Sequence, residues 1–190
     1  IHLLPGVNTL FATLLDAPWF VQHAPRNLTL CLSGGTPLKP AVNERWQEVV
    51  GNPIYEGYGL TEASPGLTSN PIGHVCKPHS IGVPFANTLI RLVNDQGLCV
   101  PPGEAGEIIA QGPQVMQGYW HNDEATASTL KNGWLYTGDI ATMDDEGYFY
   151  IVDRKKDLVL VSGFNVYPNE VEDTIAQLET VLEVAVIGVP

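Results

Sequence analysis

The segment LTLCLSGGTPLKPAVNERWQEVVGNPIYEGY, residues 28–58, decides the fold class of this 190-residue chain. Its two ends, 28–32 and 54–58, are short apolar runs that predict strands. Between them 37–50 predicts a helix, because its apolar side chains recur at helical spacing: Val42, Trp46, Val49 and Val50. The order strand, helix, strand is typical of an α/β layer. The small residues Ser33 to Gly35 suit a tight turn or a close approach to a ligand.

The residues before this segment predict a further helix. Residues 5–15 begin with Pro-Gly and carry apolar side chains on one face: Leu10, Phe11, Leu14 and Leu15. We expect the neighbour of this face to lie outside the chain, so that these side chains are exposed and drive association. We therefore expect a compact molecule that tends to self-associate.

After Glu62 the chain is rich in proline and glycine, which divide it into short segments. The segments predict strands at the following positions: 88–93, 106–110, 136–143 and 147–152. A hairpin turn is predicted at 144–147 and a short helix at 123–130. Together these elements predict a small antiparallel, β-barrel-like subdomain.

A charged group, Asp153 to Asp157, follows these strands, and we place a domain boundary at 153–156. The residues beyond it predict the start of a small α+β domain: a strand at 158–161, a turn at Gly163, a helix at about 168–178 and a strand at 184–187. The sequence thus predicts a mixed α/β chain in two parts. The boundary separates residues 1–152 from residues 153–190.

The composition argues against several classes of function. Twenty-one acidic against nine basic residues give a net charge of −12, so no cationic face is expected for nucleic acid. The three cysteines are far apart and the five histidines show no metal-binding spacing, which argues against a metal site built from these side chains. No apolar run approaches the ~18 residues of a membrane span. We expect a cytoplasmic protein in a reducing compartment.

The pentapeptide Tyr58-Gly59-Leu60-Thr61-Glu62 ends the second strand of the α/β layer, where such folds place ligand-contacting groups. Glycine beside an aromatic ring lets a flat ligand lie close. The hydroxyl of Thr61 can donate to a phosphate oxygen, and the carboxylate of Glu62 is an oxygen ligand of the kind that Mg²⁺ prefers. The alternative is a simple turn that ends the strand.

Two further motifs suit other parts of a nucleotide. In Tyr136-Thr137-Gly138-Asp139 the carboxylate can accept hydrogen bonds from both ribose hydroxyls, although the same tetrapeptide also suits a β-turn. At the domain boundary the guanidinium of Arg154 can reach phosphate or ribose oxygens, and its neighbours can absorb the dihedral change of a hinge. A solvated linker is the alternative there.

In this order and at these separations, the three motifs resemble those of the adenylate-forming superfamily of acyl-CoA synthetases, firefly-type luciferases and peptide-synthetase adenylation domains. Further stretches agree with it along the chain: LSGGTPL at 32–38, GEAGEII at 103–109 and GPQVMQGYW at 112–120. Within the superfamily, EGYGLTE at 56–62 and IVDRKKDLVLVSGFNVYPNEVED at 151–173 look most like bacterial long-chain fatty acid CoA ligases.

The resemblance implies a reaction in two steps. A fatty acid carboxylate attacks the α-phosphate of ATP in the presence of Mg²⁺, giving acyl-AMP and pyrophosphate, and the CoA thiol then displaces AMP. It implies that 1–152 belong to the large AMP-binding domain and that 153–190 begin the small C-terminal domain. Fatty acid, ATP and CoA are then the partners. Peripheral contact with the inner membrane and a homodimer of the full-length protein are compatible with this family.

The resemblance also implies roles for particular residues. Four would line the adenine: Gly34, Gly35, Gly57 and Tyr58. Thr61 would bind the α-phosphate and Glu62 would hold Mg²⁺, which makes these two the catalytic residues. Asp139 would take the ribose hydroxyls, with Arg154 assisting.

Two residues near the C-terminal end would serve the second step. Lys156, or a close neighbour, would be the hinge of the small domain. Gly163, which has no side chain, would leave room for the pantetheine arm of CoA.

The resemblance places two essential parts beyond the ends of the chain. A phosphate-binding loop would lie upstream of Pro5, and a lysine that bridges the carboxylate and the α-phosphate would lie downstream of Pro190. We therefore expect a piece of a longer enzyme that has no ligase activity by itself and binds ATP weakly if at all. Two alternatives stay open: a sister ligase for aryl, short-chain or amino acids, and a non-catalytic nucleotide-binding remnant.

Overall fold

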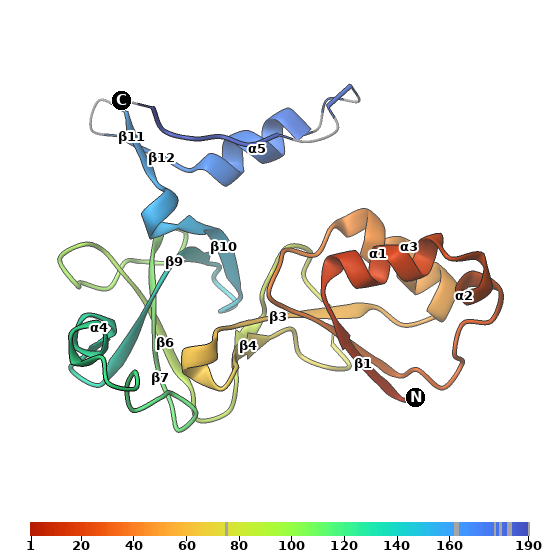
Figure 1. Cartoon of the computed structure of the whole chain (residues 1–190), viewed down its shortest axis with the longest axis horizontal. Coiled ribbons are helices and arrows are strands. Elements are labelled where there is room, and N and C mark those ends of the chain that lie inside the picture. The colour runs from red at the N-terminus through yellow and green to blue at the C-terminus, as the bar shows by residue number, and fades with distance from the viewer. Residues whose placement is uncertain (75, 162–163, 177, 179, 182–183, 190) are drawn as a thin grey trace.

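The computed structural model describes residues 1–190 except 75, 162–163, 177, 179, 182–183 and 190 (Figure 1). The first of its two larger sheets has five strands in the order β1-β2-β3-β4-β5. Their bounds are β1 Leu3–Gly6, β2 Leu30–Ser33, β3 Ile54–Gly59, β4 Gly66–Ser69 and β5 Val83–Pro84. β1, β2 and β3 run parallel, whereas β4 is antiparallel to both β3 and β5. The parallel half is the predicted α/β layer.

Three helices cover one face of the parallel strands: α1 (Asn8–Asp16), α2 (Pro18–Gln22) and α3 (Pro40–Val50) (Figure 1). The core between helices and sheet is built from fully buried side chains: Phe11, Leu15, Phe20, Leu28, Cys31, Trp46 and Ile54. The ring of Trp46 lies at its centre. Phe11 meets this ring edge-on at 4.9 Å, and Phe20 stacks on it at 5.3 Å between centroids.

The expected exposure of the first helix is wrong for two of its four apolar side chains. Phe11 and Leu15 are buried, because α1 packs on α3 within the chain itself. Leu14 is half-buried against the same core, and Leu10 is exposed.

The same helix also begins later than its predicted start at Pro5. Residues 3–6 form β1, whose Leu4 lies opposite Cys31 of β2. Backbone groups that pair in a parallel ladder cannot also begin a helix, so α1 starts at Asn8. The predicted helix 37–50 is confirmed and begins at Pro40, a residue suited to the first helical turn.

The second sheet is antiparallel, with the order β10-β9-β7-β6 and β8 paired to β9. Its strands are β6 Leu89–Val93, β7 Gly106–Gln111, β8 Leu130–Lys131, β9 Trp134–Met143 and β10 Phe149–Arg154. Irregularities between Glu107 and Ile109 and between Ile151 and Asp153 shift the register, and such bulges bend a sheet. The four strands and the hairpin predicted for this region are confirmed.

The two sheets are joined near the start of β5. The N–H of Ile81 donates to the carbonyl of Phe149 at 2.9 Å, and the N–H of Phe149 donates to the carbonyl of Gly82 at 3.0 Å. Tyr58 packs against two buried clusters that include residues of the second sheet. The end of β3 is therefore held against the second sheet.

Two short helices lie in the connections. The 3-10 helix η1 (Thr61–Ala63) follows β3, and α4 (Asp123–Thr129) precedes β8, as predicted. The side chain of Asn122 caps α4 by accepting a hydrogen bond from the N–H of Ala125.

The C-terminal part leaves the second sheet through the 3-10 helix η2 (Lys155–Asp157). A two-stranded ribbon follows, β11 (Val159–Val161) and β12 (Phe164–Val166), and then α5 (Pro168–Ala176) (Figure 1). The strand predicted at 184–187 is wrong. The N–H of Val186 donates to Oε1 of Glu172 at 2.7 Å, so a side chain rather than a neighbouring strand satisfies it.

Within the described part of the chain, no helix has the length and apolar character needed to cross a membrane.

Candidate nucleotide site

A cavity of about 270 Å³ lies where β2 and β3 end, beside β9 and β10. Parallel strands of an α/β layer present ligand sites at this edge, because their carboxyl ends leave a crevice. Five of the residues predicted to bind a nucleotide line the cavity: Gly35, Gly57, Tyr58, Asp139 and Arg154. They come from both sheets, so the tertiary structure brings together motifs that are far apart in the sequence.

Two glycines at the ends of β2 and β3 lie close to the backbone of a neighbouring strand. A Cβ on Gly57 would lie 2.9 Å from the carbonyl oxygen of Thr68, and a Cβ on Gly34 would lie 3.3 Å from that of Gly57. Gly35 has a φ of 83°, in the region that favours glycine. The part of the cavity wall formed by Gly35 and Gly57 is therefore bare backbone, against which a flat ring can lie.

Tyr58, Asp139 and Arg154 form a polar group on one side of the cavity. The hydroxyl of Tyr58 donates to Oδ2 of Asp139 at 2.5 Å, and Nε of Arg154 lies 3.5 Å from Oδ1. Burial and the neighbouring negative charge of Asp139 raise the pKa of Tyr58 well above its ordinary value, so the phenol stays protonated as a donor. Asp139 is thereby kept as an acceptor at the rim of the cavity.

The turn that carries Asp139 is itself fixed within β9. The N–H of Asp139 donates to Oγ1 of Thr137 at 3.1 Å, and that hydroxyl donates to the carbonyl of Ile108 at 2.9 Å. The N–H of Gly138 donates to Oε1 of Glu107 at 3.1 Å. The carbonyl of Ile108 and the side chain of Glu107, both in β7, thus help to position Asp139, the residue predicted to bind the ribose.

Thr61 and Glu62 lie on η1 and do not line this cavity. Thr61 lines a second, largely apolar cavity of about 480 Å³, which shares Gly57, Tyr58 and Gly59 with the first. The two cavities therefore meet at the end of β3. Gly34, the remaining predicted adenine residue, lines the second cavity.

Glu62 is a half-buried carboxylate whose Oε1 accepts a hydrogen bond from the hydroxyl of Tyr119 at 2.6 Å. In the described residues no three side chains of His, Cys, Asp or Glu gather to form a protein-only metal site. A single carboxylate next to Thr61, which lines the second cavity, is compatible with the way Mg²⁺ is held, because this ion usually combines one or two carboxylates with substrate phosphates and water. The donor set therefore suits a nucleotide-bound Mg²⁺.

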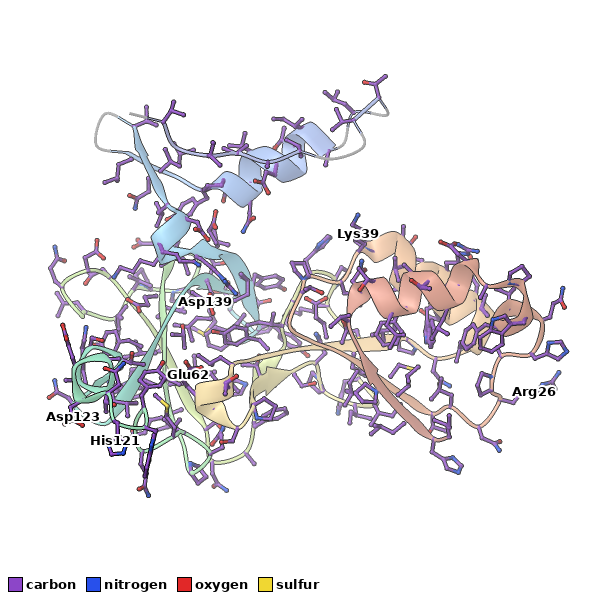
Figure 2. All side chains as sticks on the ribbon, viewed as in Figure 1. Arg26, Lys39, Glu62, His121, Asp123 and Asp139 are labelled. Atoms are coloured by element: carbon purple, nitrogen blue, oxygen red, sulfur yellow. The ribbon has the colours of Figure 1, made fainter. Side chains whose placement is uncertain are left out.

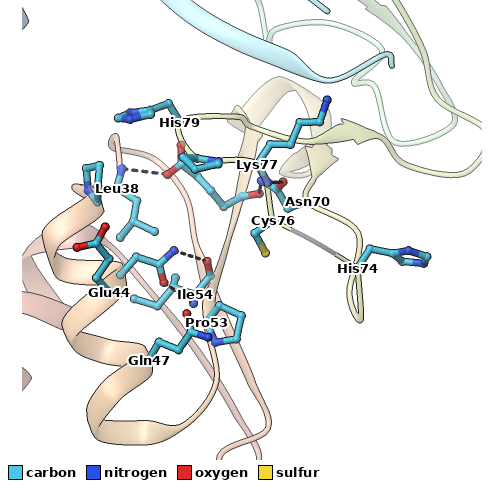
Figure 3. Close-up of a pocket in the computed structure, with 14 residues that line it drawn as sticks. Leu38, Glu44, Gln47, Pro53, Ile54, Asn70, His74, Cys76, Lys77 and His79 are labelled. Carbon is cyan, nitrogen blue, oxygen red and sulfur yellow. Dashed lines mark hydrogen bonds between the residues drawn. The ribbon is translucent and has the colours of Figure 1, made fainter. Parts of the chain in front are cut away.

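Sequence reasoning missed Glu56, which lies beside the predicted Gly57. Burial raises the pKa of Glu56 to about 7, while a hydrogen bond from the N–H of Leu38, 3.1 Å from Oε2, acts in the opposite direction. Glu56 lines both the first cavity and a third cavity of about 410 Å³, which is also lined by residues of α3 and by residues of 70–74 and 76–79. Figure 3 shows this third cavity. The alternation of side chains along a strand could have indicated this burial. Glu56 is two residues after the core residue Ile54, so both side chains lie on the same face of the sheet.

The remaining predicted residues lie at the C-terminal end. Lys156 is in η2, which directly follows β10. Gly163, predicted for the CoA step, lies outside the described residues. The neighbouring Lys155, which was not predicted, places Nζ 2.9 Å from Glu107 and 2.9 Å from Asp95.

Comparison with known proteins points to one family. The family model described as AMP-binding enzyme matches residues 1–120. The chain is 51% identical over 187 residues to a long-chain-fatty-acid–CoA ligase of Escherichia coli O6:H1, covering 98% of the chain and 33% of the relative. It is 44% identical over 189 residues to the ligase of the same name from Bacillus subtilis, covering 99% and 34%. The chain spans about a third of the length of the relatives it matches.

Other ligases and solved structures extend the comparison. A feruloyl-CoA synthase of an Amycolatopsis species is 42% identical over 191 residues, covering 100% of the chain and 39% of the relative. ATP-bound MatB from Rhodopseudomonas palustris superimposes with a TM-score of 0.91 at 37% identity, covering 100% and 38%. The anthranilate CoA ligase AuaEII with anthranoyl-AMP gives a TM-score of 0.86 at 36% identity, covering 100% and 36%.

Proposed function

Because the chain belongs to the AMP-binding enzyme family, we propose that the whole protein is an ATP-dependent long-chain fatty acid CoA ligase. The acid and ATP would give acyl-AMP and pyrophosphate, and the CoA thiol would then displace AMP to give the thioester. The observation that carries the proposal is the nucleotide cavity, where glycine backbone and Asp139 meet in a chain about half identical to ligases of this name.

The residues of the cavity would act by binding and orienting ATP. The bare backbone at Gly35 and Gly57 would receive the adenine beside the ring of Tyr58. The carboxylate of Asp139, held by Tyr58, would accept hydrogen bonds from the ribose hydroxyls. Arg154 would add a positive charge at the same rim. Fixing the nucleotide in this way lowers the entropic cost of reaching the transition state.

Thr61 and Glu62 would serve the reacting phosphate. The hydroxyl of Thr61, at the meeting point of the two cavities, would donate to an oxygen of the α-phosphate. The carboxylate of Glu62 would hold Mg²⁺, which when bound stabilises the charge that develops on the phosphate oxygens. We propose these two as the catalytic residues of the chain.

The apolar cavity beside Thr61 suits the acyl chain of the acid. Leu32, Tyr55 and Phe85 contribute to its lining, and the cavity reaches the residue proposed for the α-phosphate. An acid whose carboxylate lies at Thr61 would therefore extend its hydrocarbon over the uncovered face of the first sheet.

The second step would depend on the C-terminal part. We propose a domain boundary at 153–156, with Lys156 as the hinge and Gly163 beside the pantetheine arm of CoA. A cytoplasmic enzyme would meet the inner membrane only peripherally, where its lipid substrate lies. Light scattering of the full-length protein will decide between a monomer and a homodimer.

A ligase for aryl acids is the second candidate. It is favoured by the 42% identity to a feruloyl-CoA synthase and the 36% identity to an anthranilate CoA ligase. Identity to the long-chain ligases is higher, which places them first.

The test is an assay of the full-length protein with ATP, Mg²⁺, CoA and a ladder of carboxylic acids, scoring AMP and acyl-CoA. Turnover that peaks on long fatty acids supports the proposal. Turnover confined to aryl, short or amino acids would move the protein to a sister group, and no turnover would favour a nucleotide-binding remnant. The 190-residue chain, run alongside, tests the expectation that it forms no thioester by itself.

A further inference from the structure

Residues 112–120 form a strap that crosses the loop carrying Thr61 and Glu62. The N–H of Met116 donates to the backbone carbonyl of Glu62 at 2.8 Å. The side-chain amide of Gln114 donates to the carbonyl of Gly66 at 3.1 Å and to Oγ1 of Thr88 at 2.8 Å. The strap is therefore attached to η1 itself and to the start of β4, which follows it.

The strap also reaches the side chain of Glu62. The hydroxyl of Tyr119 donates to Oε1 at 2.6 Å, a length typical of a hydrogen bond to an ionised carboxylate. No hydrogen bond reaches Oε2 of Glu62 from the part of the chain that the structure describes.

Tyr119 is itself fixed by the first turn of α4. Its N–H donates to Oγ1 of Thr126 at 2.9 Å, and that hydroxyl donates to the carbonyl of Asn122 at 2.8 Å. A Cβ on the preceding Gly118 would lie 2.9 Å from Cγ2 of Thr126, so the strap approaches the helix closely. Figure 2 shows Glu62 on the side of its loop that faces the α4 region.

We propose that Tyr119 is a positioning residue, which holds Oε1 of Glu62 so that Oε2 faces the divalent cation of the bound nucleotide. A glutamate has three side-chain torsions, and a short bond to one oxygen removes much of their freedom before the cation arrives. The inference rests on the proposed function for the cation role of Glu62, but it is independent of the acid substrate.

The hydroxyl of Tyr119 would contribute through cation affinity. Removing a group that orients a metal ligand typically costs about 10–100-fold in metal affinity. The carboxylate itself would remain, so a high concentration of Mg²⁺ would restore the reaction. A merely structural role for Tyr119 predicts a loss of stability instead, with cation affinity unchanged.

The test is direct binding of Mn²⁺ to the full-length protein in complex with α,β-methylene-ATP, followed by electron paramagnetic resonance. We expect Tyr119→Phe to raise the Kd for Mn²⁺ about tenfold, and Thr126→Val to raise it less in the same direction. Tyr150→Phe is the matched control, because Tyr150 also donates to a carboxylate, Oδ2 of Asp144 at 3.1 Å, on a hairpin away from this loop. Its Kd should match that of the wild type.

Activity gives a second readout. The Mg²⁺ concentration for half-maximal turnover should rise in Tyr119→Phe, while kcat at saturating Mg²⁺ should return close to the wild-type value. A double variant, Tyr119→Phe with Glu62→Gln, should bind Mn²⁺ no more weakly than Glu62→Gln alone, because both changes act on one interaction.

Three outcomes would overturn the inference. Wild-type Mn²⁺ affinity in both Tyr119→Phe and Thr126→Val would show that the bond does not position the ligand. Additive losses in the double variant would show that Tyr119 acts elsewhere. Unchanged affinity in Glu62→Gln would remove the cation role of Glu62 and the inference with it. Turnover on an unexpected acid would alter only the proposed substrate class.

Discussion

The hydroxyl of Tyr58 lies 2.5 Å from Oδ2 of Asp139, and the two residues are 81 positions apart in the chain. One belongs to β3 of the first sheet and the other to β9 of the second. The bond therefore connects the two sheets at the point where the nucleotide cavity opens. It also satisfies one carboxylate oxygen of Asp139 and orients the group.

The first prediction concerns this pair. Asp139→Asn should raise the KM for ATP of the full-length protein about 10–100-fold, since a hydrogen bond to a charged group contributes about 1.5–3 kcal/mol. Tyr58→Phe should have a smaller effect, about tenfold or less, because it removes only the group that orients Asp139. Steady-state kinetics with varied ATP measures both. An unchanged KM in Asp139→Asn would contradict the assignment of the ribose site.

The second prediction concerns Glu56 and pH. Burial raises its pKa to about 7 from an ordinary value of 4.5. Because the pKa is higher in the folded state, ionisation favours unfolding: the cost is absent below pH 4.5, grows between pH 4.5 and 7, and is complete above pH 7. Glu56→Gln, which cannot ionise, should therefore stabilise the chain at pH 8 by about 1–3 kcal/mol.

Urea unfolding at pH 8 and at pH 4.5 checks this sign. The difference between Glu56→Gln and the wild type should shrink towards zero at the lower pH. Glu48→Gln on the exposed side of α3 serves as the control and should show no such pH dependence. A variant that is less stable than the wild type at pH 8 would show that the Glu56 carboxylate is stabilising.

The third prediction concerns the core of the α/β layer. Trp46 is fully buried between the rings of Phe11 and Phe20, so Trp46→Ala should lower the free energy of unfolding by about 3–5 kcal/mol. Trp120 is 88% exposed, and Trp120→Ala should change it by less than about 0.5 kcal/mol. Thermal or urea unfolding compares the two. Equal effects would mean that the helices do not cover the sheet as described.

The fourth prediction concerns the carboxylate of Glu107, which contacts Lys155 of η2. Its Oε1 accepts from the N–H of Gly138 and its Oε2 from Nζ of Lys155, and the side chain is 9% exposed. Glu107→Gln should cost about 1–3 kcal/mol, since it weakens hydrogen bonds that are shielded from water. Asp95 contacts the same Nζ but is 85% exposed, so Asp95→Asn should have little effect. Chemical unfolding of both variants provides the measurement, and a larger effect for Asp95→Asn would refute the argument.

Most helices and strands could be predicted from the sequence, because the pattern that indicates each one lies within its own short segment. The helical spacing in 37–50 and the division of the chain after Glu62 into short segments by proline and glycine need no distant partner to be recognised. The nucleotide motifs were recognised in the same way, since each is a short continuous run. Gly35, Gly57, Tyr58, Asp139 and Arg154 do line one cavity.

The errors fall where an element depends on a partner far away in the chain. Residues 3–6 become a strand only because β2 lies alongside, and residues 184–187 form none because the N–H of Val186 meets Glu172 instead. Periodicity carries no information about such partners.

By itself, the sequence determined the α/β layer, the antiparallel subdomain and the identity of the motif residues. The tertiary structure decided that Tyr58 meets Asp139, that Tyr119 meets Glu62 and that Glu56 is buried enough to raise its pKa. The physical reason is that hydrogen bonds and desolvation depend on distances between atoms, and for residues far apart in the chain these distances are set by packing. The local pattern, in contrast, reflects only the backbone geometry that each short segment favours.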